Sequence, residues 1–140
     1  MNRPPALDRY RPWFAAAAIY NIGWGAAVVA LPTVFLDALG VRPPEVIALW
    51  QVVGMMVLVF GPAYWWASRD PWAHRHLVLI GTLGKVMGVV GFVIAAAIGQ
   101  LPWSFGLIVL FNDVIWLPAF GLYVLDVVRV TGLPRLLLGD

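Results

Sequence analysis

The chain has 140 residues, of which 62% are hydrophobic and only 11% are charged. A soluble domain carries about a quarter charged residues, so this composition predicts that lipid surrounds most of the surface. The formal charge of +2 rests on too few groups for nucleic-acid binding. The absence of cysteine excludes disulfides, iron–sulfur clusters and thiolate catalysis.

Four apolar segments follow one another, each close to the ~20 residues that cross a bilayer core. They cover about residues 13–36, 46–67, 77–99 and 103–125. The connections are short, which favours antiparallel neighbours. We therefore expect an all-α, integral membrane four-helix bundle with up-down-up-down topology, forming a single transmembrane domain over residues 1–140. The first segment is longer than the apolar region of a signal peptide and is expected to remain as a span.

The first two segments each carry one polar side chain at depth. Asn21 lies eight residues into the first segment and shares a helix face with small residues such as Gly25. Pro32 is positioned to end that helix. Gln51 lies ~9 Å from the outer edge of the second segment. Pro62, further along that segment, removes a main-chain hydrogen bond and predicts a kink.

The third segment carries a lysine beside a row of glycines. Gly81, Gly84, Gly88 and Gly91 fall within an arc of roughly 80° on a helical wheel, with Lys85 at its border. Gly84 and Gly88 form the small-x-x-x-small pattern that lets membrane helices approach closely. Lys85 is ~12 Å inside the span, which is deep for its side chain to reach the headgroups. We expect Lys85 to face the other helices.

The fourth segment supplies an opposite charge. Asp113 lies ~15 Å from the outer edge, within a few ångströms of the depth of Lys85. Because an unpaired charge at this depth costs from about 3 to more than 10 kcal/mol, we predict that Lys85 and Asp113 pair. Pro118 predicts a kink in this span. The residues that share the polar and aromatic face of Asp113 are Asn112, Trp116, Phe120 and Tyr123.

Arginine distribution predicts the orientation of the spans. One side of the bundle holds Arg3, Arg9, Arg11, Arg69, Arg75, Arg129 and Arg135, whereas the other side holds Arg42. Positive residues accumulate in cytoplasmic loops. We expect a multi-pass protein of the cell inner (plasma) membrane with both termini cytoplasmic.

The polar groups of the four segments predict one buried site that binds or relays a small lipid-soluble ligand or a proton. Its candidate residues are Lys85, Asp113, Asn112, Asn21, Gln51, Trp116, Trp24 and Tyr123. Polar groups between membrane helices also serve as interhelical hydrogen bonds alone, which is the competing interpretation for Asn21 and Gln51. A purely structural ion pair is the competing interpretation for Lys85 and Asp113. Trp24 and Trp116, at intermediate depth, have helix packing as their competing interpretation.

Two other functional classes remain open. The chain could be an accessory or assembly subunit of a larger membrane complex, with the glycine face of the third segment against a partner. It could also be an intramembrane enzyme that modifies an isoprenoid or lipid, for which Asp113 is the only acid candidate. Phosphate-loop, zinc-protease and serine-triad patterns are absent, so the balance is against an enzyme. No metal or cofactor is expected, and the expected partners are the lipid bilayer, a hydrophobic small molecule or lipid, and a homo-oligomer or larger membrane complex.

Overall fold

The structure is a computed structural model that describes residues 5–41 and 47–138, and every regular element in these two ranges is helical. Arg3 and Arg42, which contribute to the predicted orientation, lie outside them. The α-helices are α1 (Arg11–Ala30), α2 (Val34–Ala38), α3 (Ile47–Arg69), α4 (Arg75–Ala97), α5 (Gly106–Val109), α6 (Leu117–Thr131) and α7 (Leu133–Leu138). The 3₁₀ helices are η1 (Pro5–Tyr10) and η2 (Trp103–Phe105), and η3 (Leu110–Val114) is a π-helix.

Four continuous helical stretches are long and apolar enough to cross a membrane: Ala6–Ala30, Ile47–Arg69, Arg75–Ala97 and Trp103–Thr131. They confirm the four predicted apolar helices.

The prolines have different effects on the spans. The first span ends at Ala30 rather than near residue 36, because Pro32 has no N–H to continue the helix, and α2 begins after a turn. Pro62 lies inside α3 without interrupting it. Pro118 lies in the first turn of α6, directly after the π-helix and turn that interrupt the fourth span.

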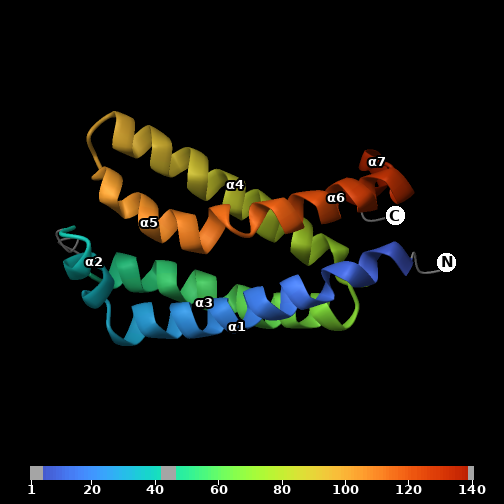
Figure 1. The fold of residues 1–140 in the computed structure, drawn as a ribbon, viewed down its shortest axis with the longest axis horizontal. Coiled ribbons are helices and arrows are strands. Elements are labelled where there is room, and N and C mark those ends of the chain that lie inside the picture. The colour runs from blue at the N-terminus through green and yellow to red at the C-terminus, as the bar shows by residue number, and fades with distance from the viewer. Residues whose placement is uncertain (1–4, 42–46, 139–140) are drawn as a thin grey trace.

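The long helices form two pairs (Figure 1). Helix α1 lies along α3, and α4 lies along the fourth span, which is built from α5, η3 and α6. Both chain termini lie at one end of the molecule, called the terminal end below. Helix α2 and the connection between α4 and α5 lie at the opposite end, called the loop end.

Glycines allow α1 and α3 to approach closely. A Cβ at Gly25 would lie 2.6 Å from the main-chain oxygen of Gly54 and 2.7 Å from the nitrogen of Leu58. A Cβ at Gly54 would lie 2.8 Å from Cγ1 of Val28. Asn21, Gly25 and Val28 are all buried, which confirms the predicted packing face of the first span.

The predicted close-packing motif of the third span is only half correct. A Cβ at Gly88 would meet the carboxylate of Asp113, whereas a Cβ at Gly84 or Gly91 would meet nothing within 4 Å. Gly81 packs against the ring of Tyr64. The glycines therefore admit side chains from neighbouring helices instead of bringing two helix backbones together.

Aromatic rings fill the terminal end. This aromatic cluster consists of Tyr10, Phe14, Tyr64, Phe120 and Tyr123, all buried. Phe14 contacts Phe120 and Tyr123 edge to face, with ring centroids 5.2 and 5.0 Å apart. Tyr64 contacts Phe120 in the same way at 5.0 Å. Edge-to-face pairs stabilise a core beyond the area that they bury, so this end of the bundle is firmly packed.

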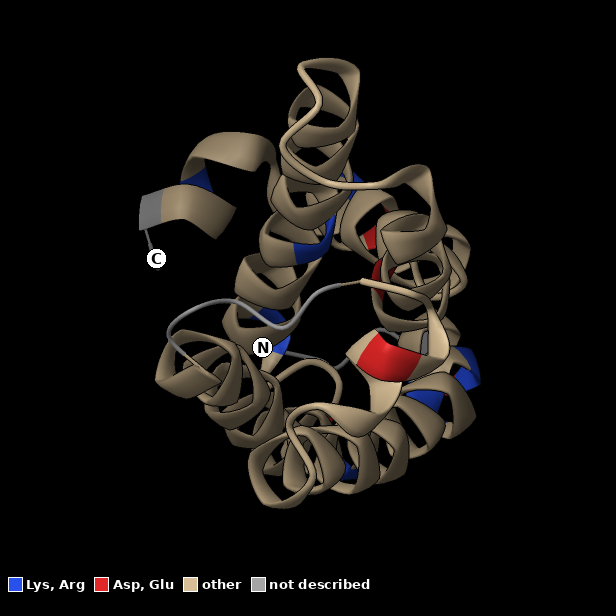
Figure 2. Cartoon of the chain, turned by 90° about the vertical axis from the view of Figure 1, so that its left-hand side faces the viewer, with Lys and Arg blue, Asp and Glu red and all other residues tan. Residues whose placement is uncertain are grey.

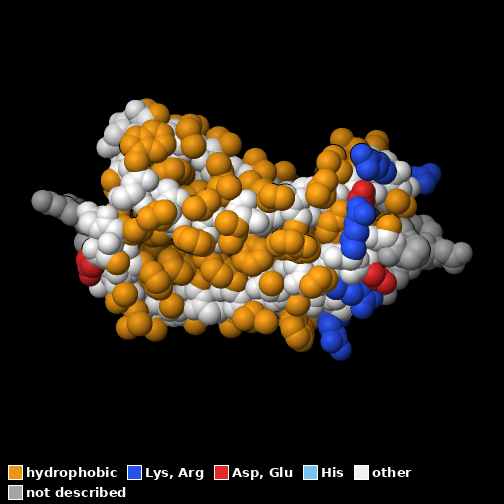
Figure 3. All heavy atoms as spheres, viewed as in Figure 1, with side chains coloured by type: hydrophobic (Ala, Val, Ile, Leu, Met, Phe, Trp, Pro, Cys, Tyr) orange, Lys and Arg blue, Asp and Glu red, His pale blue; other side chains and the backbone are white. Residues whose placement is uncertain are grey.

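The surface is largely apolar between the two ends (Figure 3), and the view along the bundle shows few charged residues on the helices (Figure 2). Basic side chains gather at the terminal end on the face shown in Figure 3.

Candidate functional site

Lys85 of α4 and Asp113 of η3 form an ion pair inside the bundle. The ammonium nitrogen of Lys85 lies 3.8 Å from Oδ1 of Asp113. Lys85 is only 5% exposed, so its side chain does not extend to the headgroup region. Asp113 is less buried, with its side chain 21% exposed. The predicted meeting of opposite charges from the last two spans is confirmed.

A main-chain carbonyl completes the binding of the ammonium group. Lys85 donates a hydrogen bond to the main-chain oxygen of Asn112 at 2.5 Å. The ring centroids of Tyr64 and Phe120 lie 5.9 and 5.8 Å from its nitrogen, within the range of cation–π attraction. One carboxylate, one carbonyl and two ring faces therefore compensate for the loss of water around Lys85.

The π-helix explains why a carbonyl is directed at Lys85. In η3 the N–H of Ile115 donates to the oxygen of Leu110 at 3.1 Å, five residues back rather than four. The indole of Trp116 donates to the oxygen of Phe111 at 2.9 Å. In the widened turn, side-chain donors therefore bind main-chain oxygens: Lys85 binds that of Asn112, and Trp116 binds that of Phe111. Pro118, just beyond the turn, has no N–H with which to bind such an oxygen. Such π-turns occur frequently at functional sites.

Gly88 provides the space for the carboxylate. A Cβ at this position would lie 2.7 Å from Oδ2 and 3.3 Å from Cγ of Asp113. A larger residue at position 88 would therefore push Asp113 away from its present position.

Asn112 is buried with one unsatisfied atom. Its side-chain nitrogen donates to the main-chain oxygen of Ile108 at 3.0 Å. Its Oδ1 has no hydrogen-bond partner in the described part of the chain, although the residue is only 8% exposed. Trp50 Nε1, in α3, and Arg75 Nε, in α4, are buried donors without an acceptor among the described residues.

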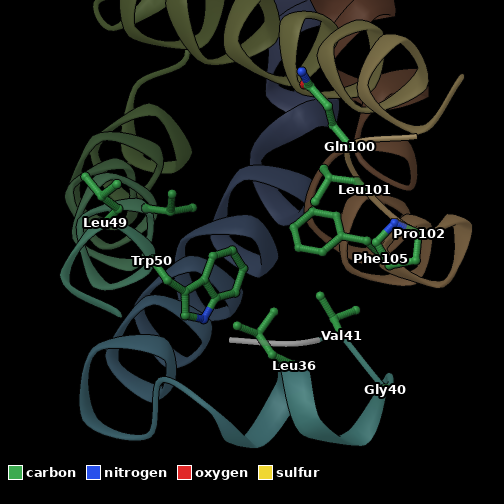
Figure 4. Close-up of a pocket in the computed structure, with 10 residues that line it drawn as sticks. Leu36, Gly40, Val41, Leu49, Trp50, Gln100, Leu101, Pro102 and Phe105 are labelled. Atoms are coloured by element: carbon green, nitrogen blue, oxygen red, sulfur yellow. The ribbon is translucent and has the colours of Figure 1, made fainter. Parts of the chain in front are cut away.

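Three adjoining cavities, together called the cleft below, lead from the loop end to the ion pair. The inner cavity, about 160 Å³, is lined by Lys85 and Asp113 and by the polar residues Asn21, Tyr64 and Asn112. The middle cavity, about 330 Å³, shares Val57, Asn112 and Asp113 with it. The loop-end cavity, about 680 Å³, shares Trp50, Val53, Leu101 and Phe105 with the middle cavity (Figure 4).

The predicted site residues fall into two groups. Lys85, Asp113, Asn112, Asn21 and Trp24 all line the inner or the middle cavity, so the structure brings them together.

The other predicted residues, Gln51, Trp116 and Tyr123, line none of the cavities of the cleft. Gln51 donates from α3 to the oxygen of Val29 at 2.8 Å and so connects α3 to α1. Tyr123 donates to the oxygen of Pro71 within the terminal end.

Tyr64 and Gly88 belong to the site but were not among the predicted residues. Tyr64 supplies the polar contribution of the second span that was expected from Gln51. A helical wheel of the third span placed Gly88 correctly on the inner face, and its spacing of three residues from Lys85 was the available signal. Tyr64 carried no comparable signal, since an aromatic residue near a helix end is ordinarily interfacial.

Comparison of the chain with protein-family models, with curated proteins and with solved structures found no match, so the evidence for its function lies in the geometry of the Lys85–Asp113 site.

Proposed function

We propose that the four spans cross the cell inner (plasma) membrane in up-down-up-down order with both termini in the cytoplasm. Arg69 ends α3 and Arg75 begins α4, so both lie at one end of the bundle. Arg129 lies in the last turn of α6, near the C-terminus. An excess of arginine favours the cytoplasmic side. Since the chain has no cysteine, single cysteines in the loops, labelled by an impermeant maleimide, would test this orientation.

We further propose that the protein binds a small lipid-soluble molecule in the cleft, next to Lys85 and Asp113. The observation that carries this proposal is the overlap of the three cavities, which connects the loop end to the ion pair through shared lining residues. Aromatic and aliphatic side chains line most of the cleft, and polar groups converge at its inner end. This is the usual composition of a small-molecule site.

The geometry favours ligand binding over proton relay. A relay needs hydrogen-bonding groups on both sides of the ion pair. On the side of the terminal end, Lys85 faces the rings of Tyr64 and Phe120. Beyond them lie Phe14 and Val78, both 0% exposed. On this side, the described contacts of the ammonium group are therefore ring faces, which disfavours proton relay.

To test ligand binding, a large side chain is introduced into the cleft at a position that does not contact the ion pair. Val53 is 45% exposed and lines the loop-end and middle cavities, whereas its neighbour Val52 is 49% exposed and lines neither. Native mass spectrometry after gentle detergent extraction should detect a retained small molecule on the wild type and on Val52→Trp, and should lose it on Val53→Trp. Equal retention by the two variants, or a wild type without any adduct, would contradict the proposal.

A second candidate function is an intramembrane enzyme acting on an isoprenoid or lipid. It is favoured by the aromatic lining of the middle cavity beside Asp113, in which Trp24 and Trp50 could stabilise positive charge. Asp113 would then be the proton donor. A change in the mass of the released molecule on incubation with wild type, but not with Asp113→Asn, would favour this candidate over simple binding.

A third candidate function is an accessory subunit of a larger membrane complex. Gly84 and Gly91 of α4 are exposed, and a Cβ at either would meet nothing within 4 Å, so a helix of another chain could approach them along the side of the cleft that they line. Gly88, in contrast, is occupied by Asp113 within the chain. A higher mass that is lost on Gly84→Leu would favour this candidate.

A further inference from the structure

Two acceptor groups at the inner end of the cleft have no hydrogen-bond donor among the described residues. Oδ1 of Asn112 is buried without a partner. The carboxylate of Asp113 receives no hydrogen bond from the described residues, because its distance of 3.8 Å from the Lys85 ammonium is that of an ion pair and exceeds the hydrogen-bond range. Acceptors of two consecutive residues of the same π-turn, Asn112 and Asp113, thus have no donor among the described residues.

Lys85 does not bind the side-chain oxygen of Asn112. Its ammonium group donates to the main-chain oxygen of Asn112 at 2.5 Å, on the backbone rather than on the side-chain amide. The side-chain amide nitrogen of Asn112 is held by Ile108 and therefore fixes Oδ1 as the atom without a partner. Asn112 and Asp113 line both the inner and the middle cavity, and the side chain of Asp113 is 21% exposed.

We propose that the ligand of the cleft has a hydrogen-bond donor, a hydroxyl or ammonium group, at its polar end, and that this group binds Asn112 Oδ1 and the Asp113 carboxylate. The inference rests on the proposed ligand binding and specifies its chemistry. The apolar body lies in the middle cavity between Trp24, Trp50 and Phe92.

Acceptor-only polar groups do not fit against these two oxygens. A ketone or a carboxylate in the same place would set oxygen against Asn112 Oδ1 and against a carboxylate, leaving both without donors. A hydroxyl or ammonium group satisfies a buried acceptor and gains a hydrogen bond to a charged group, which is stronger than one between neutral groups.

The experiment compares matched photoaffinity probes on the wild-type protein in neutral-lipid nanodiscs. Two probes have the same alkyl chain and the same diazirine position, but one ends in a primary alcohol and the other in its methyl ether. A second pair ends in a primary ammonium and in a trimethylammonium group. Each pair differs in the N–H or O–H donor, and the two pairs differ in charge. Labelled peptides containing lining residues of the middle cavity, quantified by mass spectrometry, report binding.

We expect the alcohol and the primary ammonium to label the cleft at roughly tenfold lower concentration than their partners without a donor. Asn112→Leu, which is similar in size, should reduce this preference to roughly threefold or less. Gln51→Leu is the matched control, because it also removes an amide but lines no part of the cleft, and it should keep the wild-type preference.

The failures of the two proposals are distinguishable. Equal labelling of the cleft within both pairs would overturn the donor requirement while leaving ligand binding intact. A donor preference that persists in Asn112→Leu would overturn the assignment to this residue. Absence of cleft labelling by all four probes would contradict ligand binding itself.

Discussion

The two ends of the bundle differ in how tightly their side chains pack. At the terminal end, side chains from the first, second and fourth spans meet through the aromatic cluster, with Phe14 and Phe120 fully buried. At the loop end the spans leave the middle and loop-end cavities, and the buried cluster there is smaller, built around Val28, Leu36 and Trp50. Rings fill the interior of the terminal end, whereas at the loop end rings such as Trp24, Trp50 and Phe92 line the middle cavity.

The ion pair lies at the boundary between these two ends. Lys85 is covered by ring faces on one side and borders the inner cavity on the other. A charge at such a boundary is held by firm packing and can still be reached by a ligand. The comparison suggests that the terminal end provides stability and the loop end provides access, and the following predictions test this division.

The largest effect is expected at the boundary itself. Lys85→Met should lower the free energy of unfolding by about 3 kcal/mol, because it leaves the carboxylate of Asp113 unpaired. The double variant Lys85→Met with Asp113→Leu should recover a large part of this loss, since no charge remains. A double-mutant cycle from thermal melts measures the coupling. Strictly additive effects would mean that the two side chains do not depend on each other.

A smaller loss is expected from removal of a ring at the terminal end. Phe120→Ala should cost about 2 kcal/mol, because the edge-to-face contacts with Phe14 and Tyr64 disappear and the neighbouring helices can fill the cavity only in part. Phe105→Ala, at the loop end, should cost about 1 kcal/mol or less, since the residue already borders two cavities. Comparable losses in denaturant-free thermal melts would remove the distinction between a packed and a hollow end.

The pairing of Lys85 with Asp113 could be predicted from sequence because both charges lie at similar depth, and depth follows from a fixed rise per residue. The hydrogen bond from Lys85 to the main-chain oxygen of Asn112 could not be predicted, because a π-turn shifts every later residue of the span by about one position relative to an ideal helix. Trp116 and Tyr123, placed near Asp113 on an ideal wheel, line no part of the cleft: Trp116 donates to Phe111 of its own span, and Tyr123 contacts Pro71 in the terminal end.

Two glycines of α4 should respond with opposite sign. Gly88→Ala should destabilise the protein by about 1.5 kcal/mol, because its Cβ would lie 2.7 Å from an oxygen of Asp113 that Lys85 holds in place. Gly84→Ala should stabilise it by about 0.5 kcal/mol, since the new methyl group meets nothing within 4 Å and alanine favours the helix. Thermal melts of both variants measure the difference.

This pair of variants also tests how glycines should be interpreted from sequence. Gly84 and Gly88 have the spacing of a helix-packing motif, yet only the environment distinguishes them, and that environment depends on a side chain of another span. Equal effects of the two substitutions would mean that the loop-end half of α4 adjusts freely and that Gly88 does not fix the position of Asp113.

The smallest effect concerns a polar contact that supports the terminal end. The hydroxyl of Tyr10 donates to Oδ2 of Asp126 at 2.6 Å, and Arg9 also contacts this oxygen. Tyr10→Phe keeps the ring against Tyr123 but removes a hydrogen bond to a carboxylate, so it should cost about 1 kcal/mol. The loss stays small because the Asp126 carboxylate keeps Arg9 as a partner.

Tyr20→Phe is the control: this tyrosine is half-buried, its hydroxyl has no hydrogen bond to the described residues, and its effect should stay below about 0.5 kcal/mol. If the two variants have the same melting temperature, the terminal end is stabilised by its rings alone. The polar contact between η1 and α6 then contributes nothing to the stability of the end that packs against the ion pair.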